Sequence, residues 1–537
     1  MARAQVKAGR EAEIEPRVVV IAFDSADPEL LLRWSQDGTL PTFAKLFDEG
    51  GWGRVDNDIA NVSGTVWQSF HSGLWPGRHG FYDGTKYFDC QTYEDSVDFS
   101  SRADVPRETI WEIVSRNQRR VAVIDATEII PTETINGLIL DGWGTHDRNR
   151  ATGRKADFHT VPKDLRGEVL AKYGEDPLGI FDAACDALKP RNNDELIWLR
   201  DAIIRRIEIK ARLSADVLGR EPWSYFQTTF AGAHCIGHQC YHYHDPLHPR
   251  HDPTAVKTLG DPFREVYVAL DSALKQVMEG VPEDANVIVY ASHGMGPNYT
   301  ATGALLEKIL LRLEGLEAPE KAESAISFAR KVWRGLPAPL RRMVINVRAR
   351  KFEARIQKLI QPAKADRKFF QQHVNGATGG VRINLEGREA HGRVKPGAEY
   401  EALCESLTKD LLDIVNDETG EPLVASVLRS SEIYEGPFVD RMPDLMVMWN
   451  RSAPISRIRS SKVGLLSDPN PSLRSGDHTP QGMFFALGPG IQKGEVAPVE
   501  VVDFAPTIMA LLGLDESEFD GRRVEALGAA FAGSPVN

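Results

Sequence analysis

Apolar segments without polar alternation recur along this chain, with residues of helical pattern between most of them. The first runs from Arg17 to Phe23 as RVVVIAF. A strand that is apolar at nearly every position suits a parallel sheet that helices cover on both faces. Similar segments follow at Val121–Ile124, Leu138–Leu140, Ser224–Thr229, Val287–Tyr290, Leu445–Met448 and Met483–Leu487. The alternation predicts an α/β fold with a doubly wound, mostly parallel sheet.

The chain has 537 residues, which is more than a single small hydrophobic core needs. We therefore expect two domains, or one large domain with insertions. Two helical and charged stretches interrupt the alternation of strands and helices, and we expect them to be insertions. The second of them is basic and amphipathic; we expect a helical cap on the core, and a helix that binds a partner or a membrane surface is the alternative. The predicted parts are a core at 17–302 and 371–525, insertions at about 150–220 and at 303–370, and tails at 1–16 and 526–537.

Composition excludes several classes of partner. The formal net charge of −12 argues against binding to a nucleic acid polymer or to an anionic membrane surface. The first residues are charged and lack the apolar part of a secretory signal, and no apolar run reaches about 18 residues, so we expect a soluble protein without a membrane span. The five cysteines form no CxxC pair, and an odd number fits reduced thiols in the cytoplasm.

Residues suited to metal binding come directly after or before the apolar segments. Ligands of open α/β sheets bind beyond the carboxyl ends of the strands. Asp24 directly follows the first segment and suits a carboxylate ligand of a divalent cation, with a helix N-cap as the alternative. His293 follows Val287–Tyr290 within ASHGM, where Gly294 lets the backbone turn sharply. His478 precedes another strand within GDHTPQGMFFALGPG.

The segment AHCIGHQCYHYHDPLHPRH, which follows Ser224–Thr229, is unusually rich in histidine. His234 and His238 are four residues apart, so on a helix they lie on one face and can share one cation. A solvated loop, or one in which histidine stacks on tyrosine, is the alternative. We therefore treat the pair as candidate metal ligands.

Two further segments carry candidates for chemistry. Residues 61–80, NVSGTVWQSFHSGLWPGRHG, offer the hydroxyl groups of Ser63 and Thr65, although an alcohol is a weak nucleophile until a base or a metal lowers its pKa. DGWGTHDRN places His146 and Arg148 just after Leu138–Leu140. The guanidinium of Arg148 can bind two oxygens of an anionic group at once. Both residues are candidates for substrate binding, with an exposed loop as the alternative.

The order of the candidate residues along the chain resembles that of the alkaline phosphatase superfamily. The order is Asp24, Ser63, His234-x₃-His238, the HG pair at His293 and the GxH at His478. The similarity is closest to its type I phosphodiesterase and nucleotide pyrophosphatase branch, and it extends from about residue 17 to 525. SGLWPGRHG resembles the TGLxPxxHG segment of that branch, and VVDFAPTIMALLGL resembles its closing helix. In that branch the nucleophile lies nine residues before the Thr or Ser of the TG or SG pair. Counting back from Ser72 gives Ser63, with Thr65 in reserve.

The resemblance implies two divalent cations, zinc first and manganese as the alternative. Asp24, Ser63 and His293 would hold one, and His234, His238 and His478 would hold the other. The pattern expects aspartate where His234 and Ser292 stand. A histidine keeps a good zinc ligand but removes a negative charge. Ser292 leaves its site with one carboxylate, so this site is weak, recruits another acid or stays empty.

The implied activity is the metal-dependent hydrolysis of a small phosphate ester, as a phosphodiesterase or phosphomonoesterase, through a phosphoseryl intermediate on Ser63. A phosphonate or sulfate ester is an alternative substrate, and a catalytically impaired binding or regulatory homologue is an alternative because of Ser292. The sulfatase branch is disfavoured, since it needs C/S-x-P-x-R and Ser63 is followed by GTVW. A dinucleotide-binding dehydrogenase is excluded because FDSAD lacks the glycine fingerprint.

Overall fold

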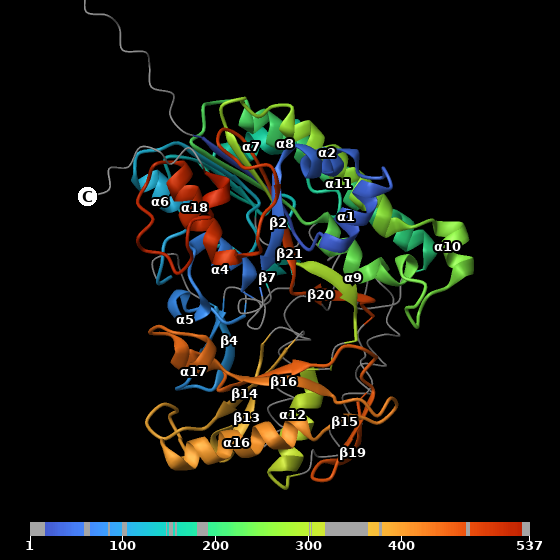
Figure 1. Ribbon diagram of the computed structural model, residues 1–537, viewed down its shortest axis with the longest axis vertical. Helices are drawn as coiled ribbons and strands as arrows, with labels where there is room; N and C mark the ends of the chain where they lie inside the picture. Colours follow the sequence, from blue (N-terminus) through green and yellow to red (C-terminus); the bar gives the residue numbers. More distant parts are fainter. Residues whose placement is uncertain are drawn as a thin grey trace, which may run out of the picture.

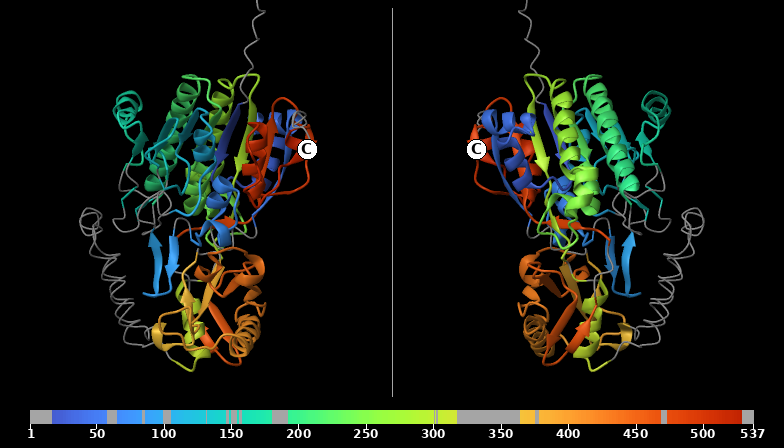
Figure 2. Two further views of the ribbon diagram at one scale, coloured as in Figure 1. Left: turned by 90° about the vertical axis from the view of Figure 1, so that its left-hand side faces the viewer. Right: turned by 90° about the vertical axis from the view of Figure 1, so that its right-hand side faces the viewer.

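The computed structural model describes most of the chain, and all structural statements below concern this part. The described residues are 17–57, 65–83, 86–98, 105–130, 132–145, 148–149, 154–155, 158–179, 192–299, 301, 303–316, 364–374, 378–468 and 473–528. Within them a ten-stranded sheet lies between layers of helices, and a smaller part with its own sheet lies beside it (Figures 1 and 2).

The large sheet is mostly parallel around its centre. Its strands, in order across the sheet, are β22 (Gly494–Glu495), β2 (Gly51–Asp56), β21 (Gly482–Leu487), β11 (Asn286–Ala291), β1 (Val18–Phe23), β10 (Tyr225–Phe230), β5 (Val121–Ile124), β6 (Gly137–Asp141) and β9 (His159–Val161), with β23 (Val499–Glu500) beside β2. The five strands from β11 to β6 run parallel to one another. β21 and β9 flank them in the antiparallel direction. The predicted α/β fold with a mostly parallel sheet is confirmed.

Alternate residues of β1 belong to two different hydrophobic cores, which explains why the strand is apolar throughout. Val19, Ile21 and Phe23 pack in one core, and Val18, Val20 and Ala22 pack in the other. The first core is covered by α1 (Pro28–Gln36), α2 (Pro41–Glu49), α7 (Leu165–Tyr173), α8 (Asn193–Leu218), α9 (Gly232–His244), α10 (Pro253–Leu259) and α11 (Pro262–Met278). The second is covered by α4 (Val66–Ser72), α6 (Ile110–Arg116) and α18 (Phe504–Leu511) (Figure 1).

A second, antiparallel sheet lies in the smaller part. Its strands are β13 (Phe369–Gln372), β14 (Thr378–Ile383), β17 (Leu445–Trp449) and β16 (Val424–Arg429), in that order, accompanied by α12 (Gly303–Leu313) and α16 (Ala398–Leu412). We expected Leu445–Met448 to belong to the large sheet, and this was wrong. Leu445 and Val447 lie in one core of the smaller part and Met446 in another, so the strand is apolar on both faces without being parallel.

This second sheet falls inside the predicted 371–525 core, so the large sheet draws on 482–500 rather than on the whole of that range. Of the predicted cap at 303–370, residues 317–363 lie outside the described part. The insertion predicted at about 150–220 contains β9, α7 and α8. The predicted domain boundaries and tails stay predictions.

Small sheets of two or three short strands complete the fold. They are β3 (Lys86–Asp89) with β4 (Glu94–Asp98), β7 (Arg148–Asn149) with β8 (Arg154–Lys155), β12 (Gly294–Pro297) with β20 (Gly476–Thr479), and β15 (Val415–Asn416) with β18 (Arg457–Ser460) and β19 (Gly464–Ser467). The remaining helices are α5 (Pro76–His79) and α17 (Ser430–Ile433). Within the described ranges, no helix combines the length and the hydropathy that crossing a bilayer requires.

A buried ion pair fixes the loop that follows β6. Nζ of Lys210 lies 2.7 Å from Oδ2 of Asp125, and the two side chains are 2% and 0% exposed. The same carboxylate accepts hydrogen bonds from the backbone N–H groups of Trp143 and Gly144. Burial lowers the pKa of the Lys210 ammonium, and the Asp125 carboxylate opposes that shift. The pair therefore ties α8 to the carboxyl ends of β5 and β6.

We expect Asp125→Asn to lower the free energy of unfolding by about 3–5 kcal/mol, because it leaves the Lys210 ammonium buried without its counter-charge. Urea denaturation followed by circular dichroism measures this change. Glu49→Gln is the matched control, since it makes the same acid-to-amide change in the exposed Lys45–Glu49 pair. That control should cost less than about 1 kcal/mol. Equal losses in the two variants would contradict a structural role for the buried pair.

Candidate active site

The carboxyl ends of three adjacent parallel strands bring the candidate residues together. Phe23, the last residue of β1, is in register with Phe230 of β10 and Ala291 of β11. Past this point the backbones remain hydrogen-bonded: Asp24 N–H donates to Phe230 C=O, Ser292 N–H to Phe23 C=O, and His234 N–H to Asp24 C=O. Asp24, the start of α9 and the segment at Ser292 are therefore held at one edge of the sheet.

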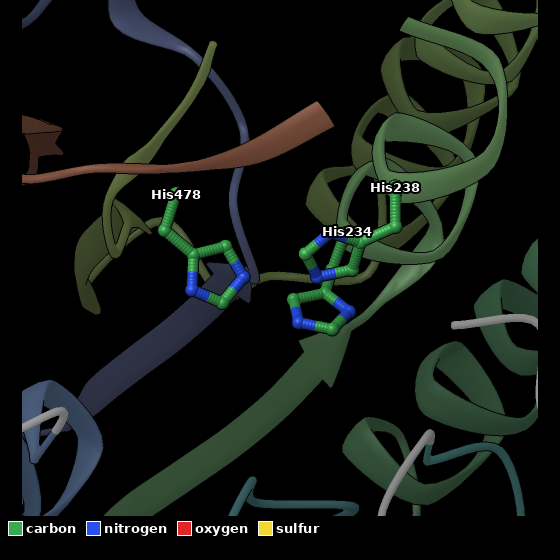
Figure 3. A group of neighbouring side chains, drawn as sticks. All are labelled: His234, His238 and His478. Carbon is green, nitrogen blue, oxygen red and sulfur yellow. The ribbon is translucent and has the colours of Figure 1, made fainter. Parts of the chain in front are cut away.

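Three imidazoles converge at this edge. His234 and His238 project from α9, and His478 approaches from β20 (Figure 3). One ligand atom from each ring lies within 4.8 Å of the others. The Nδ1 atom of His238 lies 2.8 Å from the carbonyl oxygen of Gly476. A proton on Nδ1 that is donated to this carbonyl leaves the lone pair on Nε2, which is the atom a metal needs.

The chemistry of this trio fits a divalent cation of the zinc type. Imidazole nitrogens are ligands that zinc prefers, at about 2.0–2.1 Å, so the nitrogens of one tetrahedral zinc stand roughly 3.4 Å apart. The ligand atoms of the trio already lie within 4.8 Å of one another. Three protein ligands also leave a fourth position open for water or substrate, as in catalytic rather than structural zinc sites.

A second group of polar side chains lies beside the three imidazoles. The Asp24 carboxylate accepts hydrogen bonds from Trp67 Nε1 at 3.1 Å and from Ser292 Oγ at 3.3 Å. His293 Nε2 lies 3.9 Å from Asp24 Oδ1 and 2.7 Å from Ser25 Oγ. The rings of His293 and His478 have their centroids 4.4 Å apart, so the two groups form one continuous site.

The predicted nucleophile and the substrate contacts are only partly described. Ser63 lies in 58–64 and His146 in 146–147, both outside the described residues. Arg148 begins β7, but its side chain is not among those described. Thr65 is buried and directly precedes α4. The roles of these four residues stay predictions.

Both described flanks of 58–64 contact the site. On one side, Asn57 Nδ2 donates to the carbonyl oxygens of Ser292 and Pro480. On the other side, α4 carries Trp67, which donates to Asp24. The chain therefore leaves this edge of the sheet at Asn57 and is back beside it at Trp67.

Sequence reasoning missed Ser25, Asn57 and Arg451. Ser25 follows Asp24 directly, so its place after an apolar strand was the available signal. Its φ of 56° is in the left-handed region, which a serine rarely adopts and which directs its side chain to His293. Asn57 and Arg451, whose guanidinium donates to the His478 carbonyl, carry no signal in the sequence that sets them apart.

Parallel strands that deliver acidic and imidazole side chains to one edge of a doubly wound sheet are the arrangement of the alkaline phosphatase superfamily. Residues 18–478 match the family described as type I phosphodiesterase / nucleotide pyrophosphatase. The chain therefore belongs to this family, and it is a phosphoric ester hydrolase of that superfamily. Members of the family hydrolyse phosphodiesters, act on small nucleotides or phosphate esters and are generally dependent on divalent metal ions.

One solved structure agrees with the fold. Murine ectonucleotide pyrophosphatase / phosphodiesterase 5, as an inactive variant in complex with AMP, is similar with a TM-score of 0.50 and 12% sequence identity, covering 96% of this chain and 100% of that chain. Another structure of the same murine protein has a TM-score of 0.48 and 12% identity, covering 95% and 99%. No curated protein matches the sequence.

The helix that carries Trp67 also carries a fully buried histidine. The ring of His71 packs against Trp67 and Trp111, with centroids 5.6 Å and 4.9 Å away. Burial lowers the pKa of His71 well below 6.5, and the positive charge of Arg107 adds to this shift. His71 is therefore neutral in the folded chain at a pH where the unfolded chain already binds a proton.

Because the unfolded state binds the extra proton, the stability linked to His71 is present above pH 6.5 and is lost as the pH falls below it. The loss is about 1.4 kcal/mol for each pH unit until the folded-state pKa is reached. Urea denaturation of the wild type and of His71→Gln at pH 7, 6 and 5 measures it. We expect the stability advantage of the wild type to shrink with acidification. His391→Gln, which makes the same change at an exposed position, is the matched control. A constant difference for His71→Gln would contradict the prediction.

Proposed function

We propose that this chain is a divalent-cation-dependent phosphodiesterase that acts on small phosphate esters through a phosphoseryl intermediate on Ser63. The observation that carries the proposal is the convergence of His234, His238 and His478 at the carboxyl edge of the sheet, where ligands of α/β folds bind. Zinc is the cation that three imidazoles favour, with manganese as the alternative.

A cation held by these imidazoles would supply Lewis acidity toward a phosphoryl oxygen and toward the hydroxyl of Ser63. Ser63 attacks phosphorus in line with the leaving alcohol, its proton passes to solvent, the P–O bond to the leaving group breaks, and the departing alkoxide takes up a proton from solvent. Water then cleaves the phosphoserine and restores the hydroxyl. Asp24 and His293 hold the end of β1 against β11 and keep Trp67, on the segment that follows Ser63, beside the site.

His146 and Arg148 are the residues that we propose for substrate binding. Their segment follows β6, whose loop is anchored by the buried Asp125 carboxylate through Trp143 and Gly144. β6 and β5 run parallel to β10 and β1, so this loop begins at the same edge as the metal site. The guanidinium of Arg148 there can bind two non-bridging phosphoryl oxygens.

We also propose a cytoplasmic location, which the cysteines favour.

Removal of divalent cations should abolish hydrolysis. We expect dialysis against a chelator to lower the turnover of bis-p-nitrophenyl phosphate by at least about a thousandfold, since most catalysis in phosphoryl transfer is electrostatic. Addition of zinc, or alternatively of manganese, should restore it, as followed by release of p-nitrophenolate. Unchanged turnover after the metal content has been shown to be zero would refute the dependence on a cation.

Ser63→Ala should lower turnover by at least about a thousandfold while the metal content stays that of the wild type, because the variant lacks the attacking oxygen. Steady-state kinetics and metal analysis of the same preparation measure the two quantities. Thr65→Val is the matched control, since it removes the reserve hydroxyl two residues away. Full activity of Ser63→Ala together with loss of activity in Thr65→Val would assign the nucleophile to Thr65.

The class of ester follows from a panel of p-nitrophenyl substrates. A phosphodiester, a phosphomonoester, a phosphonate and a sulfate ester are compared by kcat/KM. A nucleotide diester is added because the murine protein of similar fold was solved with AMP. The proposal expects the phosphodiesters to give the largest values. Higher kcat/KM for the sulfate or phosphonate would overturn it, and a chain without turnover and without metal would be a binding homologue.

A further inference from the structure

A continuous set of hydrogen bonds links the ends of β1 and β11. Ser25 Oγ lies 2.7 Å from Nε2 of His293, and Nδ1 of the same ring lies 2.9 Å from Ser292 Oγ. Ser292 Oγ donates to Asp24 Oδ1 at 3.3 Å and accepts from the N–H of Ser25 at 3.3 Å. Both ring nitrogens of His293 therefore contact hydroxyl groups of the chain itself.

The Ser292 hydroxyl can satisfy its three contacts at once. A serine hydroxyl has one proton to donate and two lone pairs to accept with. Ser292 gives its proton to the Asp24 carboxylate, and its two lone pairs are available to His293 Nδ1 and to the Ser25 N–H. The Nε2 atom of His293, which a cation would need, lies 2.7 Å from the Ser25 hydroxyl.

The charges at this end of the site point the same way. Ser25, Ser292 and His293 add no negative charge, and Asp24 adds one negative charge that Trp67 Nε1 already contacts. Asp27, the next carboxylate along the chain, caps α1 and accepts from the N–H of Met295. Two divalent cations a few ångströms apart repel four times as strongly as two unit charges. Among the described residues at this end of the site, the single carboxylate of Asp24 offsets little of that repulsion.

We propose that the chain holds one divalent cation, at His234, His238 and His478, and that Asp24, Ser25, Ser292 and His293 form a hydrogen-bonded support in place of a second cation site. This inference rests on the cation of the proposed function and deepens it by fixing the number of ions. Asp24 and His293 are then positioning residues: they align the His293 ring against His478 and hold α4 through Trp67.

The number of bound ions tests the inference directly. Each protein is loaded with excess Zn²⁺, desalted and analysed by mass spectrometry for zinc per chain. We expect about one zinc in the wild type and about two in Ser292→Asp, whose carboxylate replaces the hydroxyl between Asp24 and His293. Ser292→Asn, which has the shape of aspartate without its charge, should hold about one. Two zinc ions in the wild type, or one in a folded Ser292→Asp, would overturn the inference.

A double variant keeps the test decisive if Ser292→Asp fails to fold. His234→Ala with His238→Ala leaves Asp24, Ser25, Ser292 and His293 intact and should retain no zinc. Retention of an ion would place a cation at the Asp24 end and refute the inference. The same preparations separate the two proposals. One zinc per chain without any hydrolysis would contradict the proposed function and support the inference. Two zinc ions per chain with hydrolysis would support the proposed function and contradict the inference.

Discussion

The parallel register of β1 with β10 and β11 is the constraint on which the site depends. With Phe23 opposite both Phe230 and Ala291, the next residues of all three strands emerge at the same height. The hydrogen bond from His234 N–H to Asp24 C=O then fixes the start of α9 against the end of β1. A shift of one residue in β1 would turn its side chains to the opposite core and move Asp24 away from Ser292. The apolar cores on both faces prevent that shift, so burial sets the geometry of the polar site.

The third histidine reaches this edge by a different route. β20 pairs in the antiparallel direction with β12, which begins directly after His293, and this pairing sets Met295 opposite His478. The carbonyl of Gly476 accepts from His238, and a Cβ at Gly476 would lie 2.4 Å from the carbonyl oxygen of Gly237. Glycine at 476 therefore permits the close approach of β20 to α9 that brings the three rings together.

How much the sequence predicted follows from the range of the interactions involved. Strand β1 and the cover on both of its faces were predictable because every residue from Val18 to Phe23 is apolar. His234 and His238 were predictable from their helical spacing, and Asp24 and His293 from their position after strands. Leu445–Met448 was assigned to the wrong sheet because an antiparallel strand covered on both faces has the same pattern. The hydrogen bonds of Ser25 and Asn57, and the Lys210–Asp125 pair, join residues far apart in the chain, and no local pattern encodes them.

The balance of charge connects the unusual residues of the site with the number of cations. The pattern that this chain resembles expects aspartate at the positions of His234 and Ser292. Each replacement removes one negative charge, so the two together remove an amount equal to the charge of one divalent cation. At an effective dielectric constant near 20, two unit charges 4 Å apart interact by about 4 kcal/mol, so two divalent ions at that distance repel by roughly 16 kcal/mol. A site that has lost two carboxylates has lost most of the charge that offsets this repulsion. Holding a single cation restores the balance of charge. The hydroxyl of Ser292 then provides a hydrogen-bond partner for the Asp24 carboxylate and for the His293 ring, which are both buried.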